Sequence, residues 1–133
     1  MIFCKGDNDS DVDQKKLNYP IQQHFAHIYI DKISILVHHG ESENFNTNFK
    51  NRLTPNEMEI YAKKMKANIF IMGRTHKPLL ENRHGILHIN PGSPVPTVHD
   101  NISPSIAILD TRKREVKIMS VIKKGEIIKS IKF

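Results

Sequence analysis

Short apolar runs separated by turn-forming residues recur along the whole chain, and they predict a protein rich in β-strands. Runs of this length with β-branched residues, bounded by Gly, Pro, Asn or Asp, are typical of strands. Asp31-Lys32 predicts a hairpin turn between two of the runs, and Asn90–Pro94 predicts a firm turn. The runs interpreted as strands are Met1–Lys5, Gln23–Ile30, Ile33–Val37, Ile69–Met72, Ile86–Ile89, Ser105–Leu109, Val116–Ile122 and Ile127–Ile131.

One stretch carries a clear helical signal. Thr54 is a suitable N-cap, Pro55 fits the first helical position, and Glu57 is placed to close a capping box. Apolar residues then recur at helical spacing as far as Ala67, which leads directly into the next strand. The polar residues Glu41–Arg52 before this helix predict a mobile loop. The chain is therefore predicted to be α/β, with few helices to cover its sheets.

Composition and charge narrow the class of protein. A chain of 133 residues with 38% hydrophobic and 26% charged residues is globular and has room for one modest core. The formal net charge of +6 comes from dispersed lysines without interleaved aromatic residues, which argues against a dedicated nucleic-acid binder. The same charge could attract a ligand that carries phosphate.

The sequence also bears on the compartment. The longest apolar runs fall far short of the roughly 20 residues that span a bilayer, so no membrane segment is expected. Met1–Gly6 lacks the basic head and the long apolar region of a signal peptide. The single cysteine, Cys4, cannot form a disulfide within the chain and favours a reducing, cytoplasmic environment.

Three of the predicted loops carry side chains of the kinds that bind metals. Asp7 lies in an acidic loop after the first strand, His38 and His39 end the second strand of the hairpin, and His76 follows the strand after the helix. Loops at the carboxyl ends of sheet strands are where α/β proteins build their sites. Imidazole together with carboxylate suits Mn, Fe, Zn or Ni. The alternative is that each is an ordinary surface or core side chain, which is the commoner case for a lone histidine.

Four sequence segments, taken together, resemble a known family. The segments are Gly6-Asp7-Asn8-Asp9-Ser10-Asp11-Val12-Asp13-Gln14, Leu36-Val37-His38-His39-Gly40, Gly73-Arg74-Thr75-His76-Lys77-Pro78 and His88-Ile89-Asn90-Pro91-Gly92-Ser93. In this order they resemble the YfcE-type phosphodiesterases of the calcineurin-like metallophosphoesterase superfamily. The resemblance implies a four-layer sandwich of two mixed β-sheets flanked by helices. It also implies that two divalent metals, commonly manganese, hydrolyse a phosphoester by stabilising the entering and leaving oxygens.

The resemblance assigns roles by position. His39 would be a ligand of the second metal, and His76 would be a ligand of the first. Asp7 stands where the family has an asparagine ligand of the second metal, although Asn8 could take its place if the loop shifts. Asp9 matches the acidic catalytic residue that orients the site and the substrate.

Several positions depart from the family pattern. Arg74 replaces a histidine ligand, and a guanidinium cannot lose its proton to bind a cation. Arg74 is expected instead to bind a substrate phosphate through two hydrogen bonds. Glu41 replaces a histidine that is common after the His-Gly pair. Asn90–Ser93 resembles a turn that shapes the pocket without reacting.

Two family motifs do not occur in the sequence: D-x-H, which supplies two ligands of the first metal, and G-D, whose aspartate bridges both metals. Gly6-Asp7 is already assigned to the later loop. Both motifs are expected to precede Met1. Residues 1–133 are therefore interpreted as a single incomplete domain that lacks the first two strand–helix units.

Three functional hypotheses remain open. The first hypothesis is that the chain is part of a phosphodiesterase that acts on a phosphoester small molecule and is inactive without the missing segment. The second hypothesis is that the chain is a degenerate family member retained as a non-catalytic binding module. The third hypothesis is a non-functional gene fragment or a misassigned start. An exposed sheet edge would favour a homo-oligomer or a partner chain that supplies the missing segment.

Overall fold

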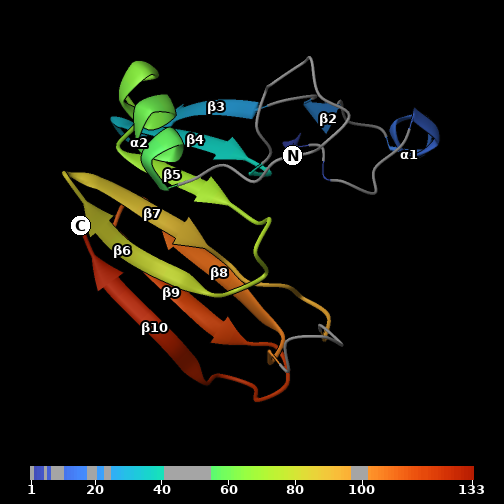
Figure 1. Ribbon diagram of the computed structural model, residues 1–133. Coiled ribbons are helices and arrows are strands. Elements are labelled where there is room, and N and C mark those ends of the chain that lie inside the picture. Colours follow the sequence, from blue (N-terminus) through green and yellow to red (C-terminus); the bar gives the residue numbers. More distant parts are fainter. Residues whose placement is uncertain are drawn as a thin grey trace.

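The computed structural model describes residues 2–4, 6, 11–17, 21–22, 25–40, 55–96 and 102–133. Within these ranges the strands form a five-stranded sheet, a three-stranded sheet and a short two-stranded pair, accompanied by two helices (Figure 1). The chain is therefore α/β and rich in strands, as the pattern of apolar runs predicts.

The five-stranded sheet is the centre of the structure. Its strands are β3 (Phe25–Ile30), β4 (Ile33–His38), β5 (Ile69–Met72), β6 (Leu79–Arg83) and β7 (Ile86–Asn90), in the spatial order β3-β4-β5-β7-β6. The three inner strands β4, β5 and β7 run parallel, whereas the edge strands β3 and β6 are antiparallel to their neighbours. The carboxyl ends of β4, β5 and β7 therefore reach the same edge of the sheet.

The second sheet is an antiparallel meander of β8 (Ser105–Asp110), β9 (Glu115–Ser120) and β10 (Ile127–Lys132), in the order β10-β9-β8. It packs on one face of the five-stranded sheet. The core between the sheets consists of side chains that are at most 5% exposed, namely Ile33, Ile35, Ile69, Leu87, Ile89 and Val116. At the edges, Thr111 Oγ1 donates a hydrogen bond to Asp31, and Lys129 Nζ donates one to the carbonyl oxygen of Pro78.

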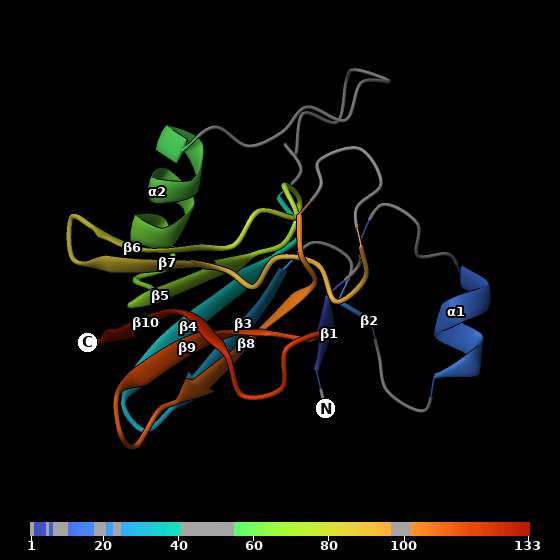
Figure 2. The same ribbon diagram turned by 90° about the horizontal axis from the view of Figure 1, so that it is seen from below.

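Helix α2 (Pro55–Lys64) covers part of the opposite face of the five-stranded sheet. Its buried residue Ala62 packs with Leu36, Phe70 and Met72 in a second apolar cluster. Figure 2 shows the resulting layers, in which α2, the five-stranded sheet and the three-stranded sheet follow one another. Of the four layers that the family resemblance implies, the described residues thus form three, and their second sheet is antiparallel.

The end of α2 and its link to the sheet have identifiable causes. The helix ends at Lys64, slightly before the predicted Ala67, because Lys66 takes a left-handed backbone conformation with φ of 51°. Glu59 forms an ion pair with Lys63 and a 2.9 Å contact with Nδ1 of His84, at the turn between β6 and β7. Lys63 first, and then His84, hold the pKa of the Glu59 carboxyl below its usual value.

The amino-terminal part contains short elements. Strand β1 (Phe3–Cys4) pairs in parallel with β2 (Ile21–Gln22), and helix α1 (Asp11–Lys16) lies between them in the sequence. The prediction of a strand over Met1–Lys5 is confirmed for its two central residues. The predicted loop Glu41–Arg52 and the helix cap Thr54 lie outside the described residues.

The main strands are present within a few residues of their predicted bounds. Asp31 and Lys32 form the predicted hairpin turn with φ values of 48° and 63°, as a tight turn between antiparallel strands requires. Strand β6 was not predicted, because Leu79 and Leu80 are followed by polar residues and show no alternation. It forms as an edge strand that depends on pairing with β7.

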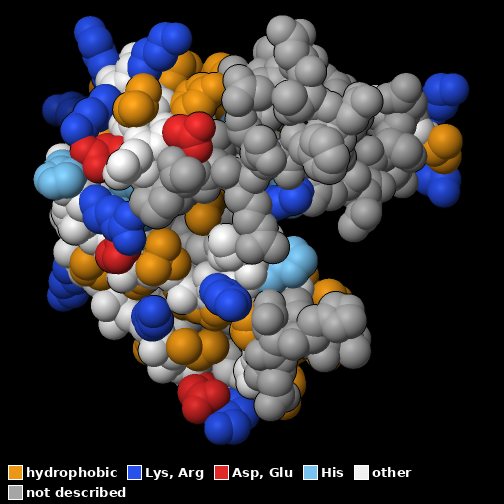
Figure 3. All heavy atoms as spheres, viewed as in Figure 1, with side chains coloured by type: hydrophobic (Ala, Val, Ile, Leu, Met, Phe, Trp, Pro, Cys, Tyr) orange, Lys and Arg blue, Asp and Glu red, His pale blue; other side chains and the backbone are white. Residues whose placement is uncertain are grey.

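The surface of the described part carries both charge signs. On the face seen in Figure 3, lysine and arginine side chains are dispersed among apolar and acidic ones. Neither described helix has the length and apolar composition needed to cross a bilayer.

A pair of isoleucine variants tests whether the two sheets share a core. Ile69→Ala should lower the free energy of unfolding by about 2–5 kcal/mol, because Ile69 is 0% exposed between the sheets. Ile108→Ala is the matched control, since Ile108 is 50% exposed on β8, and it should cost less than about 1 kcal/mol. Urea unfolding followed by circular dichroism measures both values. Equal losses would contradict the sandwich arrangement.

Candidate functional site

Three loops meet where the parallel strands β4, β5 and β7 end. His38 is the last residue of β4, and His39 and Gly40 follow it. The segment Gly73–Pro78 connects β5 to β6, and Pro91 begins the turn after β7. The parallel order of the strands brings together loops that are far apart in the sequence, at the edge where α/β proteins place their sites.

The loops after β4 and β5 are joined by a backbone hydrogen bond. The amide of Arg74 donates to the carbonyl oxygen of His39 at 2.9 Å. Gly40 makes this approach possible, because a Cβ atom at its position would lie 2.7 Å from Cβ of Arg74. Gly40 also has φ of 112°, a conformation that other residues rarely adopt. The predicted ligand His39 and the substituted position Arg74 are therefore direct neighbours.

His38 holds the first of these loops in place. Its side chain is 6% exposed, and its Nδ1 accepts a 2.7 Å hydrogen bond from the amide of Gly40. Its ring is stacked with Tyr61 of α2, with ring centroids 6.3 Å apart. The family resemblance assigned the ligand role to His39, but the pattern of residues alone did not separate His38 from His39. Strand alternation could have done so, because His38 shares the α2 face with Leu36.

His76 lies on the exposed part of the second loop. Its backbone takes a left-handed conformation with φ of 57°, and its amide donates to the carbonyl oxygen of Gly73 at 2.9 Å. Beside it, Thr75 Oγ1 accepts hydrogen bonds from the amide of Lys77 at 3.4 Å and from Nδ2 of Asn90 at 2.9 Å. Asn90 thus ties the loop that carries His76 to the end of β7.

The turn after β7 is tightly braced. Asn90 is completely buried, and its Oδ1 accepts a 2.9 Å hydrogen bond from the amide of Gly92. Ser105 of β8 donates through Oγ to the carbonyl oxygen of Pro91 at 2.7 Å and through its amide to Ser93 at 2.8 Å. These contacts are consistent with the expectation that this turn shapes the pocket without reacting. That role stays a prediction.

Two of the predicted metal ligands, His39 and His76, lie within the described residues. His39 is half-buried with its Nε2 shielded from solvent, and it brings imidazole chemistry that suits Mn, Fe, Zn or Ni. His76 lies on the adjoining loop, two residues after Arg74. Within the described ranges, no three His, Cys, Asp or Glu side chains come close enough together to hold a metal ion. Asp7 and Asp9 lie outside these ranges, so their roles stay predictions.

The family of the chain follows from its sequence and agrees with this arrangement of sheets and loops. Residues 1–114 match the Calcineurin-like phosphoesterase superfamily domain. Because the match covers most of the 133 residues, the chain belongs to this family. The resemblance read from the four sequence segments is confirmed.

The chain is also similar to individual proteins of this family. It is 31% identical over 93 residues to Phosphodiesterase YfcE of Escherichia coli strain K12, an alignment that spans 70% of this chain and 44% of that protein. The chain thus spans less than half the length of this curated relative. The solved structure of Yfce from E. coli superposes with a TM-score of 0.67 at 24% identity, covering 98% of this chain and 62% of that one. An archaeal phosphodiesterase superposes with a TM-score of 0.65 at 24% identity, covering 90% and 67%.

Two glycine variants test how firmly the turn after β7 is braced. Gly92 and Gly125 have nearly equal φ values of 84° and 83°, but only at Gly92 would a Cβ atom meet a neighbour, 2.0 Å from Oγ of Ser105. Gly125→Ala should cost about 1 kcal/mol of stability for the backbone conformation alone. Gly92→Ala should cost about 1–3 kcal/mol more, because the methyl group has no space. Thermal unfolding measures the difference, and equal costs would contradict a close contact between the turn and β8.

Proposed function

We propose that residues 1–133 form part of a metal-dependent phosphoesterase domain that hydrolyses a small phosphodiester. Membership of the phosphoesterase family supports this proposal. The observation that carries it is the hydrogen bond from Arg74 to His39, because it holds two family loops side by side at one sheet edge. The 31% identity to a phosphodiesterase favours phosphodiesters as the substrate class.

In this proposal each site residue has a separate task. His39 and His76 are metal ligands, Asp7 completes the ligand set that this chain supplies, and Asp9 orients the substrate as the acidic catalytic residue. The family implies a divalent metal, with manganese as our first choice and zinc, iron and nickel as alternatives. Such ions would supply Lewis-acid stabilisation of the charged phosphoryl group.

Arg74 is proposed to bind the substrate. Its guanidinium carries a fixed positive charge and its backbone is hydrogen-bonded to the predicted ligand His39, so we expect it to weaken cation binding in this region. The same group can donate two parallel hydrogen bonds to a phosphate. Arg74 also favours a second candidate function, in which the chain is a non-catalytic module that binds a phosphate-bearing partner.

Residues 1–133 contain neither D-x-H nor G-D outside the Gly6-Asp7 loop, so the proposed hydrolysis needs ligands from elsewhere. We propose that these residues act as one incomplete domain and that the ligands come from a segment or chain of the same family. We also propose that the chain is cytoplasmic. A homo-oligomer remains an alternative to a partner chain.

Hydrolysis of bis(p-nitrophenyl) phosphate with added manganese tests the catalytic proposal. The 133-residue chain alone should show no turnover, whereas co-expression with a family segment that carries D-x-H and G-D should produce manganese-dependent turnover. His76→Ala should lower that turnover by at least the roughly 10–100-fold known for outer-shell changes at metal sites. His84→Ala is the control, since its exposed ring lies at the turn between β6 and β7. No turnover in either arm would exclude hydrolysis and support the binding module.

The role of Arg74 can be tested separately. Arg74→His should not create turnover in the chain alone, because His76 would still lack the other ligands of its metal. In the co-expressed form it should raise manganese affinity by about 10-fold, as removal of a nearby positive charge and addition of an imidazole both favour the cation.

Manganese titration with elemental analysis measures this affinity, and the KM for the phosphodiester should rise at the same time. Arg74→Gln, which removes the charge without adding a ligand, should raise the affinity less. Turnover by the Arg74→His chain alone would contradict the proposal.

A further inference from the structure

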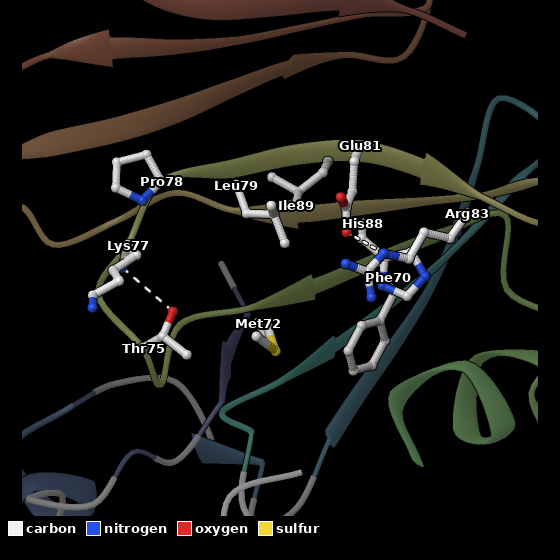
Figure 4. Close-up of a pocket in the computed structure, with 10 residues that line it drawn as sticks. All are labelled: Phe70, Met72, Thr75, Lys77, Pro78, Leu79, Glu81, Arg83, His88 and Ile89. Carbon is white, nitrogen blue, oxygen red and sulfur yellow. Dashed lines mark hydrogen bonds and ion pairs between the residues drawn. The ribbon is translucent and has the colours of Figure 1, made fainter. Parts of the chain in front are cut away.

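A cavity of about 240 Å³ opens over β5, β6 and β7, on the side of the five-stranded sheet that carries α2. Figure 4 shows an elongated space with different chemistry at its two ends. Thr75 and Lys77 lie at one end, and His88 lies at the other. Apolar side chains that include Met72 and Leu79 line the space between them. The cavity is somewhat below the roughly 300–1,000 Å³ of pockets for drug-sized ligands, so it suits a small molecule.

His88 lines this cavity with a buried ring nitrogen that has no hydrogen-bond partner. Its neighbours Leu87 and Ile89 point into the core between the two sheets, so the alternation of β7 turns His88 toward the cavity. The side chain is only 3% exposed, and its buried Nε2 has no hydrogen-bond partner. Proteins rarely leave a buried polar atom unpaired, and such an atom calls for a partner.

The state of the His88 ring follows from its surroundings. Burial first, and then the charge of Arg83, lower the pKa of His88, so the ring is neutral at pH 7. Arg83 forms an ion pair with Glu81, whose buried Oε1 is in contact with it without the alignment of a hydrogen bond. Because these two charges oppose each other, the His88 end of the cavity offers a hydrogen bond and little net charge.

The opposite end attracts an anion. Lys77 is exposed and has no carboxylate partner among the described residues, whereas Thr75 Oγ1 is engaged by Asn90. Between the ends, Met72 offers a thioether that packs favourably against an aromatic ring. The ring of Phe70 packs edge-on against the ring of His88, with centroids 5.8 Å apart, so aromatic surface also lines the cavity next to Met72.

We propose that this cavity is a second binding site, for a small hydroxyaryl carboxylate. The aromatic ring packs against Met72 and Leu79, its hydroxyl group pairs with Nε2 of His88, and its carboxylate lies beside Lys77. A phenolic hydroxyl suits either tautomer of His88, because it can donate or accept a hydrogen bond. A phosphate fits less well, since Lys77 is the one unpaired cation among the described residues that line the cavity.

The site is distinct from the loops that carry His39, but it shares the segment that carries His76. Thr75 and Lys77 flank His76 in the chain. An occupant held by Lys77 therefore restricts the loop on which His76 lies. The proposal rests on the cavity and on His88, and it holds whether or not the chain takes part in hydrolysis.

Titration of 3-(4-hydroxyphenyl)propanoate into the 133-residue chain, followed by calorimetry and by the NMR signals of the histidine rings, tests this site. We expect saturable binding of one molecule per chain and a shift of the His88 signal. 3-Phenylpropanoate, which lacks the hydroxyl group, should bind about fivefold more weakly, as the loss of one hydrogen bond predicts. Tyramine, which replaces the carboxylate with a cation, should bind more weakly still.

Side-chain variants locate the site. His88→Phe and Lys77→Gln should each weaken binding about fivefold, because each removes one polar contact. The matched controls His84→Gln and Lys113→Gln change exposed residues away from the cavity and should leave the affinity unchanged. Circular dichroism confirms folding, and the comparison of ligands on the unmodified chain decides the question if a variant fails to fold. Absence of saturable binding at millimolar concentrations, or equal affinity for the three probes, would overturn the proposal.

Discussion

The parallel pairing of β4, β5 and β7 is the constraint on which the rest of the structure depends. Parallel strands in the middle of a sheet are buried on both faces, which is why Ile33–Val37 and Ile69–Met72 are apolar almost without interruption. One face packs on the three-stranded sheet and the other packs partly on α2. Because side chains on both faces are buried, the register of the strands is strongly specified, and so is the edge at which their loops meet.

Buried polar side chains convert this edge into a defined arrangement of loops. His38 holds Gly40, Asn90 holds Thr75 and Gly92, and Ser105 holds Pro91. A buried polar atom is costly unless it is paired, so each of these contacts favours one loop conformation over others. His88 on β7 differs from these three groups, since it is buried to a similar degree but its Nε2 has no hydrogen-bond partner. In the proposed second binding site, this unpaired atom is the one that meets the hydroxyl group of the ligand.

Arg74 brings a fixed positive charge to the same edge, where we propose that a metal binds. Its backbone is tied to His39, so its position relative to the predicted ligand is set by the fold. A fixed positive charge disfavours a cation nearby and favours a phosphate. Membership of the family therefore favours a metal at this edge, whereas Arg74 favours an anion. The family alone does not determine which of the two this chain binds.

The sequence by itself determined the family, the main strands and the hairpin turn at Asp31-Lys32, because hydrophobic period and turn chemistry are local properties of the chain. It did not reveal β6, since Leu79–Arg83 becomes a strand only by pairing with β7. It also could not show that the backbone of Arg74 bonds to His39, or that His88 is buried beside an open cavity. Those facts depend on contacts between segments far apart in the chain, and only the packing of the sheets decides which of these segments meet.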